Sequence, residues 1–150
     1  MNPVEKLTAL IDEVEERMAA NNSVSNYNNN LRKENLKRTH ELYQLLKVEE
    51  KHENFETIFM YKAMNLSGIG LKRDDFCKIR EGKYIQIISI AYDVNNDGKK
   101  IARNLSLGYF GKAEKVSEEL RKDIVEFVLR WRYEKAFRHT EHYQELLSKL

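Results

Sequence analysis

Basic and aromatic side chains gather in one short stretch of the chain, residues 130–138. Guanidinium groups and aromatic rings can together hold a nucleotide, because rings stack on the base while cations contact phosphate. In a second interpretation, the tryptophan of this stretch lies in the core and the arginines point to solvent. The residues of this candidate partner- or nucleotide-binding cluster are Arg130, Trp131, Arg132, Lys135 and Arg138.

Residues of the types that bind metals or perform catalysis do not form a known motif. His139 and His142 lie one helical turn apart, but the chain has no C-x-x-C or H-E-x-x-H sequence. Residues 93–98, DVNNDG, match the first half of a calcium-binding loop, yet Asn104 stands where the final Glu is needed, so a hairpin turn fits better. We predict a protein that is not an enzyme and needs no metal or cofactor.

Three short motifs follow one another in residues 82–124. Gly82-Lys83-Tyr84 and Gly98-Lys99-Lys100 each open a predicted strand, and Leu107-Gly108-Tyr109-Phe110 leads into a helix from Lys112. With these motifs, the segment resembles the three-strand-plus-helix module of Apetala-type DNA-binding domains. It is also similar to the arm-binding domain of tyrosine integrases.

The resemblance implies a sheet that enters the major groove of DNA. Ile and Tyr stand at many positions where these families have Arg and Trp. The nucleic-acid contacts implied by the resemblance are Lys83, Gln86, Lys99, Lys100 and Arg103.

Residues 1–53 predict a helical hairpin. Asn2 suits the N-cap of a helix and Pro3 its first helical position. The apolar residues that follow recur at heptad spacing. The stretch 21–30 holds six Asn, a residue that favours turns, so we expect a loop there before a second helix over about 30–52. The heptad positions of the first helix are Val4, Leu7, Ile11, Val14 and Met18.

Residues 54–111 predict an antiparallel sheet of three or four strands. Aromatic residues alternate with other types over residues 55–61, which predicts the first strand. Turns at Glu81-Gly82 and Asn96-Asp97-Gly98 separate three more strands. The strand KYIQIISIAYD, residues 83–93, is apolar on both faces, so we expect it to be central and covered on both sides. The C-terminal helix is one expected cover, and the N-terminal hairpin or a partner subunit is the other.

Residues 112–150 contain no Gly or Pro and predict a long helix packed on the sheet. The helix either runs straight or breaks near Arg138-His139-Thr140, and a straight helix would offer its end to another protomer. The predicted fold class is α+β, with residues 1–150 as a single domain. A first apolar stripe holds Val116, Leu120, Ile124, Phe127, Val128 and Trp131, and a second holds Tyr143, Leu146, Leu147 and Leu150.

Composition and charge bear on whether the protein binds nucleic acid, forms disulfides or contacts a membrane. The formal net charge is +2, with −2 over residues 1–53, +3 over residues 54–111 and +1 over residues 112–150. This distribution permits local nucleic-acid binding without requiring it. Cys77 is the only cysteine, so no internal disulfide is possible. No apolar run approaches the ~20 residues of a membrane span, and the N-terminus does not resemble a signal peptide. We therefore expect a cytoplasmic protein without membrane contact.

Three hypotheses of function remain open from the sequence. The first is a small non-catalytic protein of phage or mobile-element type that binds nucleic acid through its sheet. The second is a phage anti-defence protein that inhibits a bacterial immune nuclease by protein–protein binding, in the manner of an anti-CRISPR protein. The third is a sponge that sequesters nucleotide signals. A homodimer is expected under each of them.

Overall fold

The computed structural model describes the backbone of residues 2–150 and the side chains of residues 2–13, 16 and 28–150. The fold is α+β, as predicted. Contacts along the chain divide it into two compact units, Met1–Glu34 and Asn35–Leu150. The elements are helix α1 (Pro3–Leu45), 3₁₀ helices η1 (Val48–Glu50) and η2 (Phe55–Met60), strands β1 (Ala63–Ser67), β2 (Tyr84–Val94) and β3 (Lys100–Lys112), 3₁₀ helix η3 (Ala113–Lys115), and helix α2 (Glu118–Ser148).

Helix α1 is one continuous helix, so the predicted helical hairpin is wrong. Its start is as expected, because the Asn2 side chain accepts a hydrogen bond from the Glu5 backbone N–H at 2.8 Å. The Asn-rich stretch 21–30 lies within the helix. Asn disfavours a helix by only about 0.7 kcal/mol per residue, and after Pro3 the helix contains no Pro or Gly that would end it. The heptad residues Val14 and Met18 lie outside the described side chains.

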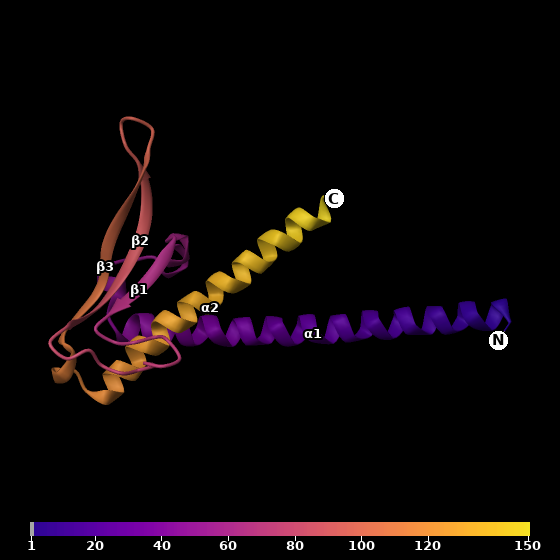
Figure 1. Cartoon of the computed structure of the whole chain (residues 1–150), viewed down its shortest axis with the longest axis horizontal. Coiled ribbons are helices and arrows are strands. Elements are labelled where there is room, and N and C mark those ends of the chain that lie inside the picture. Colours follow the sequence, from indigo (N-terminus) through magenta and orange to yellow (C-terminus); the bar gives the residue numbers. More distant parts are fainter. Residues whose placement is uncertain (1) are drawn as a thin grey trace. The chain divides into compact units, whose positions relative to one another are not determined.

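The sheet has three antiparallel strands in the order β1-β2-β3, so β2 is central, as predicted. Figure 1 shows β2 and β3 running past the end of β1 as a two-stranded hairpin. Its turn is stabilised by the Asn95 side chain, which accepts hydrogen bonds from the Asp97 and Lys99 backbone N–H groups. Gly98 supplies the positive φ of +78° that the turn needs. DVNNDG is therefore a hairpin turn, in agreement with the prediction.

Residues 55–60 form the 3₁₀ helix η2, so the strand predicted over residues 55–61 is wrong. The Asn54 side chain caps η2 by accepting a hydrogen bond from the Glu56 backbone N–H. The Ile58 and Phe59 carbonyls, which a strand would pair with a neighbour, instead accept hydrogen bonds from side chains of α2. The strand predicted before Glu81-Gly82 is reduced to an isolated bridge between Ile69 and Ile79.

Strand β3 carries two bulges where its register with β2 shifts, because Leu107 and Phe110 have no partner residue in β2. Leu107 is buried and Phe110 packs against the core, as expected from the sequence. A Cβ on Gly108 would come within 2.8 Å of the Phe110 ring, so this glycine leaves room for the ring. Gly111, at φ +94°, adopts the left-handed conformation that an L side chain rarely takes.

The core lies on one side of the sheet. Ile85 and Ile87 of β2 are fully buried, together with Ile124, Phe127 and Val128 of α2. Helix α2 is continuous through residues 138–140, so the break considered from the sequence is absent. On the opposite side, Ile88 and Ile90 are only half-buried, and the expected second cover is absent from unit Asn35–Leu150. Within the unit Asn35–Leu150, one side of the sheet is therefore open.

Candidate nucleic-acid interface

The residues implied as DNA contacts lie far apart along the sheet. Lys83 directly precedes the first residue of β2. Lys99 and Lys100 lie at the opposite end of the β2–β3 hairpin, where β3 begins after the turn. Strand β2 has 11 residues, so these ends lie roughly 33 Å apart at about 3.3 Å per residue. Gln86 lies near the Lys83 end and is half-buried. The structure does not bring these side chains together into one patch.

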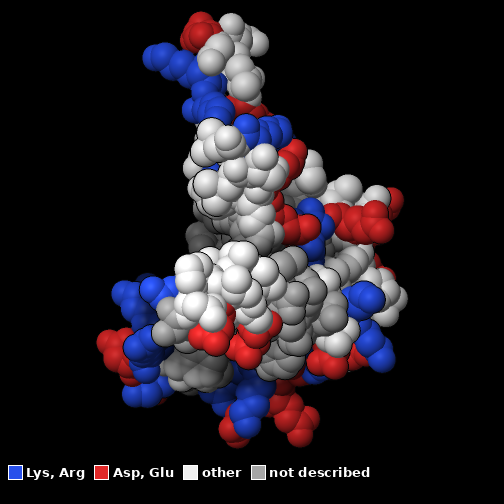
Figure 2. Space-filling view, turned by 90° about the vertical axis from the view of Figure 1, so that its right-hand side faces the viewer, with Lys and Arg blue, Asp and Glu red and all other residues white. Residues whose placement is uncertain are grey.

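Arg103 has its register partner in Ala91, on the same side of the sheet as Ile85 and Ile87. It forms an ion pair with Asp93 at 3.1 Å, and both side chains are more than half exposed. Figure 2 shows basic and acidic side chains intermixed around the tip of the hairpin. This tip, with Asp93, Asp97, Lys99, Lys100 and Arg103, is therefore not a uniformly basic surface.

The open side of the sheet, which we call the outer face, is defined by strand register and alternation. Among its residues, all of which the structure describes, there is no Asp or Glu. Two lysines lie at opposite ends of this face. Its members are Ala63, Asn65 and Ser67 of β1, Tyr84, Gln86, Ile88, Ile90, Tyr92 and Val94 of β2, and Lys100, Ala102, Asn104, Ser106, Tyr109 and Lys112 of β3.

Three tyrosines of the outer face present their rings to solvent. Tyr84, Tyr92 and Tyr109 are 49%, 51% and 59% exposed. The rings of Tyr84 and Tyr109 lie 5.8 Å apart, tilted by 31°, so they form one aromatic surface beside Lys112. The contacts expected from the sequence came from the family resemblance, and none of these tyrosines was among them. The period-two alternation of β2 could have placed Tyr84 and Tyr92 on one side, but Tyr109 lies on β3, where the register shifts.

The basic-aromatic cluster of residues 130–138 binds other parts of the same chain. Trp131 is buried and donates a hydrogen bond from Nε1 to the Ile58 carbonyl at 2.9 Å. Arg132 donates to the Met64 carbonyl at 2.9 Å and 3.2 Å, and Lys135 donates from Nζ to the Phe59 carbonyl at 2.9 Å. Burial lowers the pKa of both the Arg132 guanidinium and the Lys135 ammonium group.

The two remaining arginines of this cluster bind carboxylates. Arg130 donates to Glu126 at 2.6 Å, and Arg138 donates to the buried Glu134 at 3.0 Å while lying over the Phe59 ring. The cluster therefore fastens α2 to η2 and β1, and each of its cations already has a partner in the chain. Trp131 lies in the core, as the second interpretation expected, but the arginines bind groups of the same chain instead of pointing freely to solvent.

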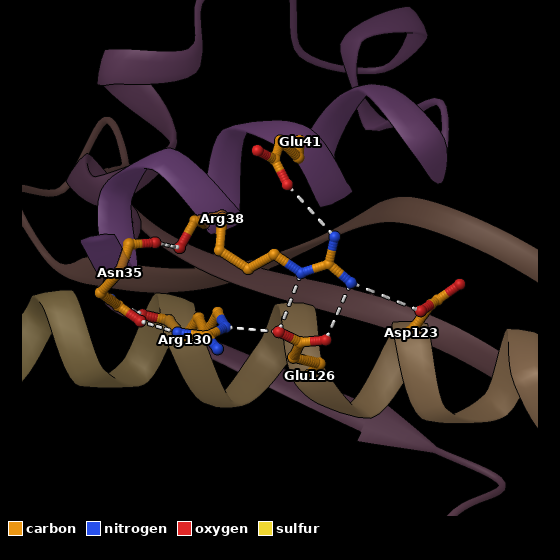
Figure 3. Close-up of polar contacts among 7 residues, drawn as sticks. Asn35, Arg38, Glu41, Asp123, Glu126 and Arg130 are labelled. Atoms are coloured by element: carbon orange, nitrogen blue, oxygen red, sulfur yellow. Dashed lines mark hydrogen bonds and ion pairs between the residues drawn. The ribbon is translucent and has the colours of Figure 1, made fainter. Parts of the chain in front are cut away.

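A polar network, which the sequence analysis missed, joins the C-terminal part of α1 to α2 (Figure 3). Arg38 donates two hydrogen bonds to Glu126, at 3.0 Å and 3.1 Å, and Asn35 exchanges hydrogen bonds with Arg130 at 2.9 Å and 3.1 Å. The bonds from Arg38 are the main cause that lowers the pKa of Glu126. Asn35 is almost fully buried, which the sequence alone does not show, so no sequence signal pointed to this network.

Beside this network lies a shallow hollow of about 520 Å³. Apolar side chains of α2 and the charged groups of the network form its walls. Its lining residues are Asn35, Glu126, Leu129, Arg130, Arg132 and Tyr133. The hollow thus lies between α2 and the C-terminal part of α1, which supplies Asn35.

Within the described residues, no three His, Cys, Asp or Glu side chains lie close enough to hold a metal ion. No described helix combines the length and the apolar content needed to cross a bilayer. Comparison with protein-family models, curated proteins and solved structures gave no match. The argument for function therefore depends on the outer face itself.

Proposed function

We propose that this protein is a non-catalytic nucleic-acid-binding protein whose contact surface is the outer face of the sheet. The observation that carries the proposal is the composition of that face, with three exposed tyrosines, two lysines and no carboxylate among its described residues. Aromatic rings on an open sheet stack on unpaired bases, whereas acidic groups would repel phosphate.

The preferred ligand is single-stranded nucleic acid. Flat tyrosine rings, such as the Tyr84–Tyr109 pair, match the exposed faces of unpaired bases. Amide and hydroxyl groups of Asn65, Gln86 and Ser106 lie between the tyrosines and can bond base edges. Lys100 and Lys112, at the two ends of the face, would contact phosphates of the strand that crosses it.

The test is fluorescence anisotropy with labelled single-stranded oligonucleotides and with a duplex of the same sequence, at low and high salt. A double variant, Tyr84→Ala with Tyr109→Ala, should weaken single-strand binding roughly ten-fold or more, because each stacked base contributes about 1–3 kcal/mol. The matched control is Tyr143→Ala, since this tyrosine is exposed on α2 rather than on the sheet.

The charge contribution is tested separately with Lys100→Glu and Lys112→Glu, against Lys122→Glu on α2 as control. The two sheet variants should weaken binding and reduce its salt dependence, because fewer counterions are released. Full binding by the double tyrosine variant, or an absence of binding even at low salt, would refute the proposal.

A further inference from the structure

A second hollow, of about 270 Å³, lies beside the edge strand β1. Its walls come from β1, from the loop of residues 68–83 and from helix α2. We call it the β1 hollow. Among its lining residues, all of which the structure describes, three are basic and none is Asp or Glu. The basic residues are Lys72, Arg80 and Arg132.

The described residues only partly balance the charge of these three cations. Arg132 donates from Nε and Nη2 to the neutral Met64 carbonyl, which leaves Nη1 without a hydrogen bond to any described residue. The Lys72 side chain is exposed and forms no ion pair with a described residue. Arg80 pairs with Asp75 at 3.4 Å, which is longer than a strong charge-assisted bond of about 2.7–2.9 Å. The β1 hollow therefore offers positive charge to an anion.

The hollow beside the polar network differs from the β1 hollow in this respect. Two arginines also line the hollow of about 520 Å³, but Glu126 lies among them and accepts a hydrogen bond from Arg130 at 2.6 Å. An anion in that hollow would face a carboxylate, which repels it. Of the two hollows, the β1 hollow is thus the one that favours an anion.

The loop of residues 68–83 is held in shape by its own hydrogen bonds. The Lys72 backbone N–H donates to the Asp75 carboxylate at 2.8 Å, and the Gly70 backbone N–H donates to the Lys78 carbonyl at 2.9 Å. A Cβ on Gly70 would come within 2.3 Å of Asp75, so the loop closes tightly at this glycine. A loop that is already ordered loses little freedom when an ion binds, and this favours binding.

We propose that the β1 hollow binds a phosphate group, and that this phosphate belongs to the nucleic-acid strand that crosses the outer face. The second part rests on the proposed function. A planar guanidinium group binds two oxygens of one phosphate at once, and a lysine adds a point charge on a flexible stem. The volume of the hollow is several times the ~30 Å³ of one water, so a phosphate fits together with the sugar or the waters beside it.

Asn65 joins the β1 hollow to the outer face, because it belongs to both. Strand register sets Tyr109, Gln86 and Ser67 in one row across the sheet. Asn65 lies two residues from this row along β1, so its backbone is roughly 12 Å from that of Tyr109, at about 4.8 Å per strand spacing and about 3.3 Å per residue. One short strand can therefore stack on Tyr109 and place a phosphate in the β1 hollow.

The first test is an NMR titration of the full chain with inorganic phosphate, at an ionic strength held constant with sodium chloride. Phosphate should cause saturable shifts of the Asn65 side-chain amide and of the Leu71 and Lys72 backbone amides, which belong to residues lining the hollow. A double variant, Lys72→Gln with Arg80→Gln, should weaken phosphate binding roughly ten-fold or more, because it removes charge-assisted hydrogen bonds.

The matched control is Arg73→Gln with Lys78→Gln, which removes the same charge from the same loop at exposed residues outside the hollow. This control should change phosphate affinity by less than about two-fold, because salt screens exposed charges that do not contact the ion. Lys72→Gln alone should also weaken phosphate binding, and circular dichroism verifies that each variant stays folded. Absence of a saturable shift at the hollow, or equal phosphate affinity of the two double variants, would overturn the proposal.

The second test measures single-strand binding by the same variants with fluorescence anisotropy. The Lys72→Gln, Arg80→Gln variant should bind the strand at least about five-fold more weakly than the control double variant, because it loses a phosphate contact. If both double variants bind equally while Tyr84→Ala with Tyr109→Ala loses binding, the hollow takes no phosphate of the strand, and the proposed function still stands. A wild type that binds phosphate in the hollow but no oligonucleotide would refute the proposed function and the second part of the proposal, and would support the first part.

Discussion

At the residue scale, Glu126 illustrates how a single carboxylate joins two helices. It accepts two hydrogen bonds from Arg38 and one from Arg130, and it is partly shielded from water. Charge-assisted bonds of this kind are stronger than neutral ones. We expect Glu126→Gln to lower the free energy of unfolding at pH 7 by about 1–2 kcal/mol, as measured by urea denaturation.

The same carboxylate gives stability a defined pH dependence. Because the folded state lowers the pKa of Glu126, its stabilising effect is present above the unfolded pKa, about 4.3, and is lost as the pH falls through the folded pKa. The stability difference between wild type and Glu126→Gln should therefore shrink below about pH 4.3. Glu118→Gln is the control, since Glu118 and Lys122 form an exposed pair worth no more than about 0.5 kcal/mol. Equal losses in both variants at pH 7 would contradict this account.

At the scale of elements, the sequence predicted those parts that local chemistry determines. The β2–β3 turn was predictable because Asn95 and Gly98 specify its geometry, and α2 because a long segment lacks Gly and Pro. Helix η2 was not predictable, because its conformation depends on hydrogen bonds from Trp131 and Lys135, more than 70 residues later in the chain. Alternation of apolar residues alone could not reveal those partners.

The dependence of η2 on α2 can be tested with Trp131→Phe. This change removes the donor to the Ile58 carbonyl and reduces packing against Phe59. The free energy of unfolding should therefore fall by about 2–3 kcal/mol. Amide exchange should accelerate at Thr57, whose backbone N–H bonds to Asn54 within this segment. Tyr133→Phe, on an exposed side of the same helix, should change stability by less than about 0.5 kcal/mol. Unchanged exchange at Thr57 in Trp131→Phe would show that η2 holds its conformation without α2.

At the scale of the whole molecule, the outer face exists only because three strands align in one register. Simple alternation along β3 from Lys100 would place Gly108 and Phe110 on this face and Tyr109 on the core side. The bulge at Leu107 reverses that assignment and turns Tyr109 outward, and the bulge at Phe110 restores the alternation, so that Lys112 lies on the outer face again. The sequence therefore located the sheet and its lysines but could not assign Tyr109 of the candidate site to its side of the sheet.

The location of the core makes a final prediction about the whole chain. The described core residues all lie between Leu36 and Trp131, and the outer face also follows residue 35. A variant that lacks residues 1–27 should therefore unfold cooperatively, with a midpoint within about 4 °C of the full chain by calorimetry. It should also bind single-stranded oligonucleotides with unchanged affinity. Loss of oligonucleotide binding by this variant alone would assign that binding to the N-terminal part of α1 instead of the outer face, because both chains carry the same three strands.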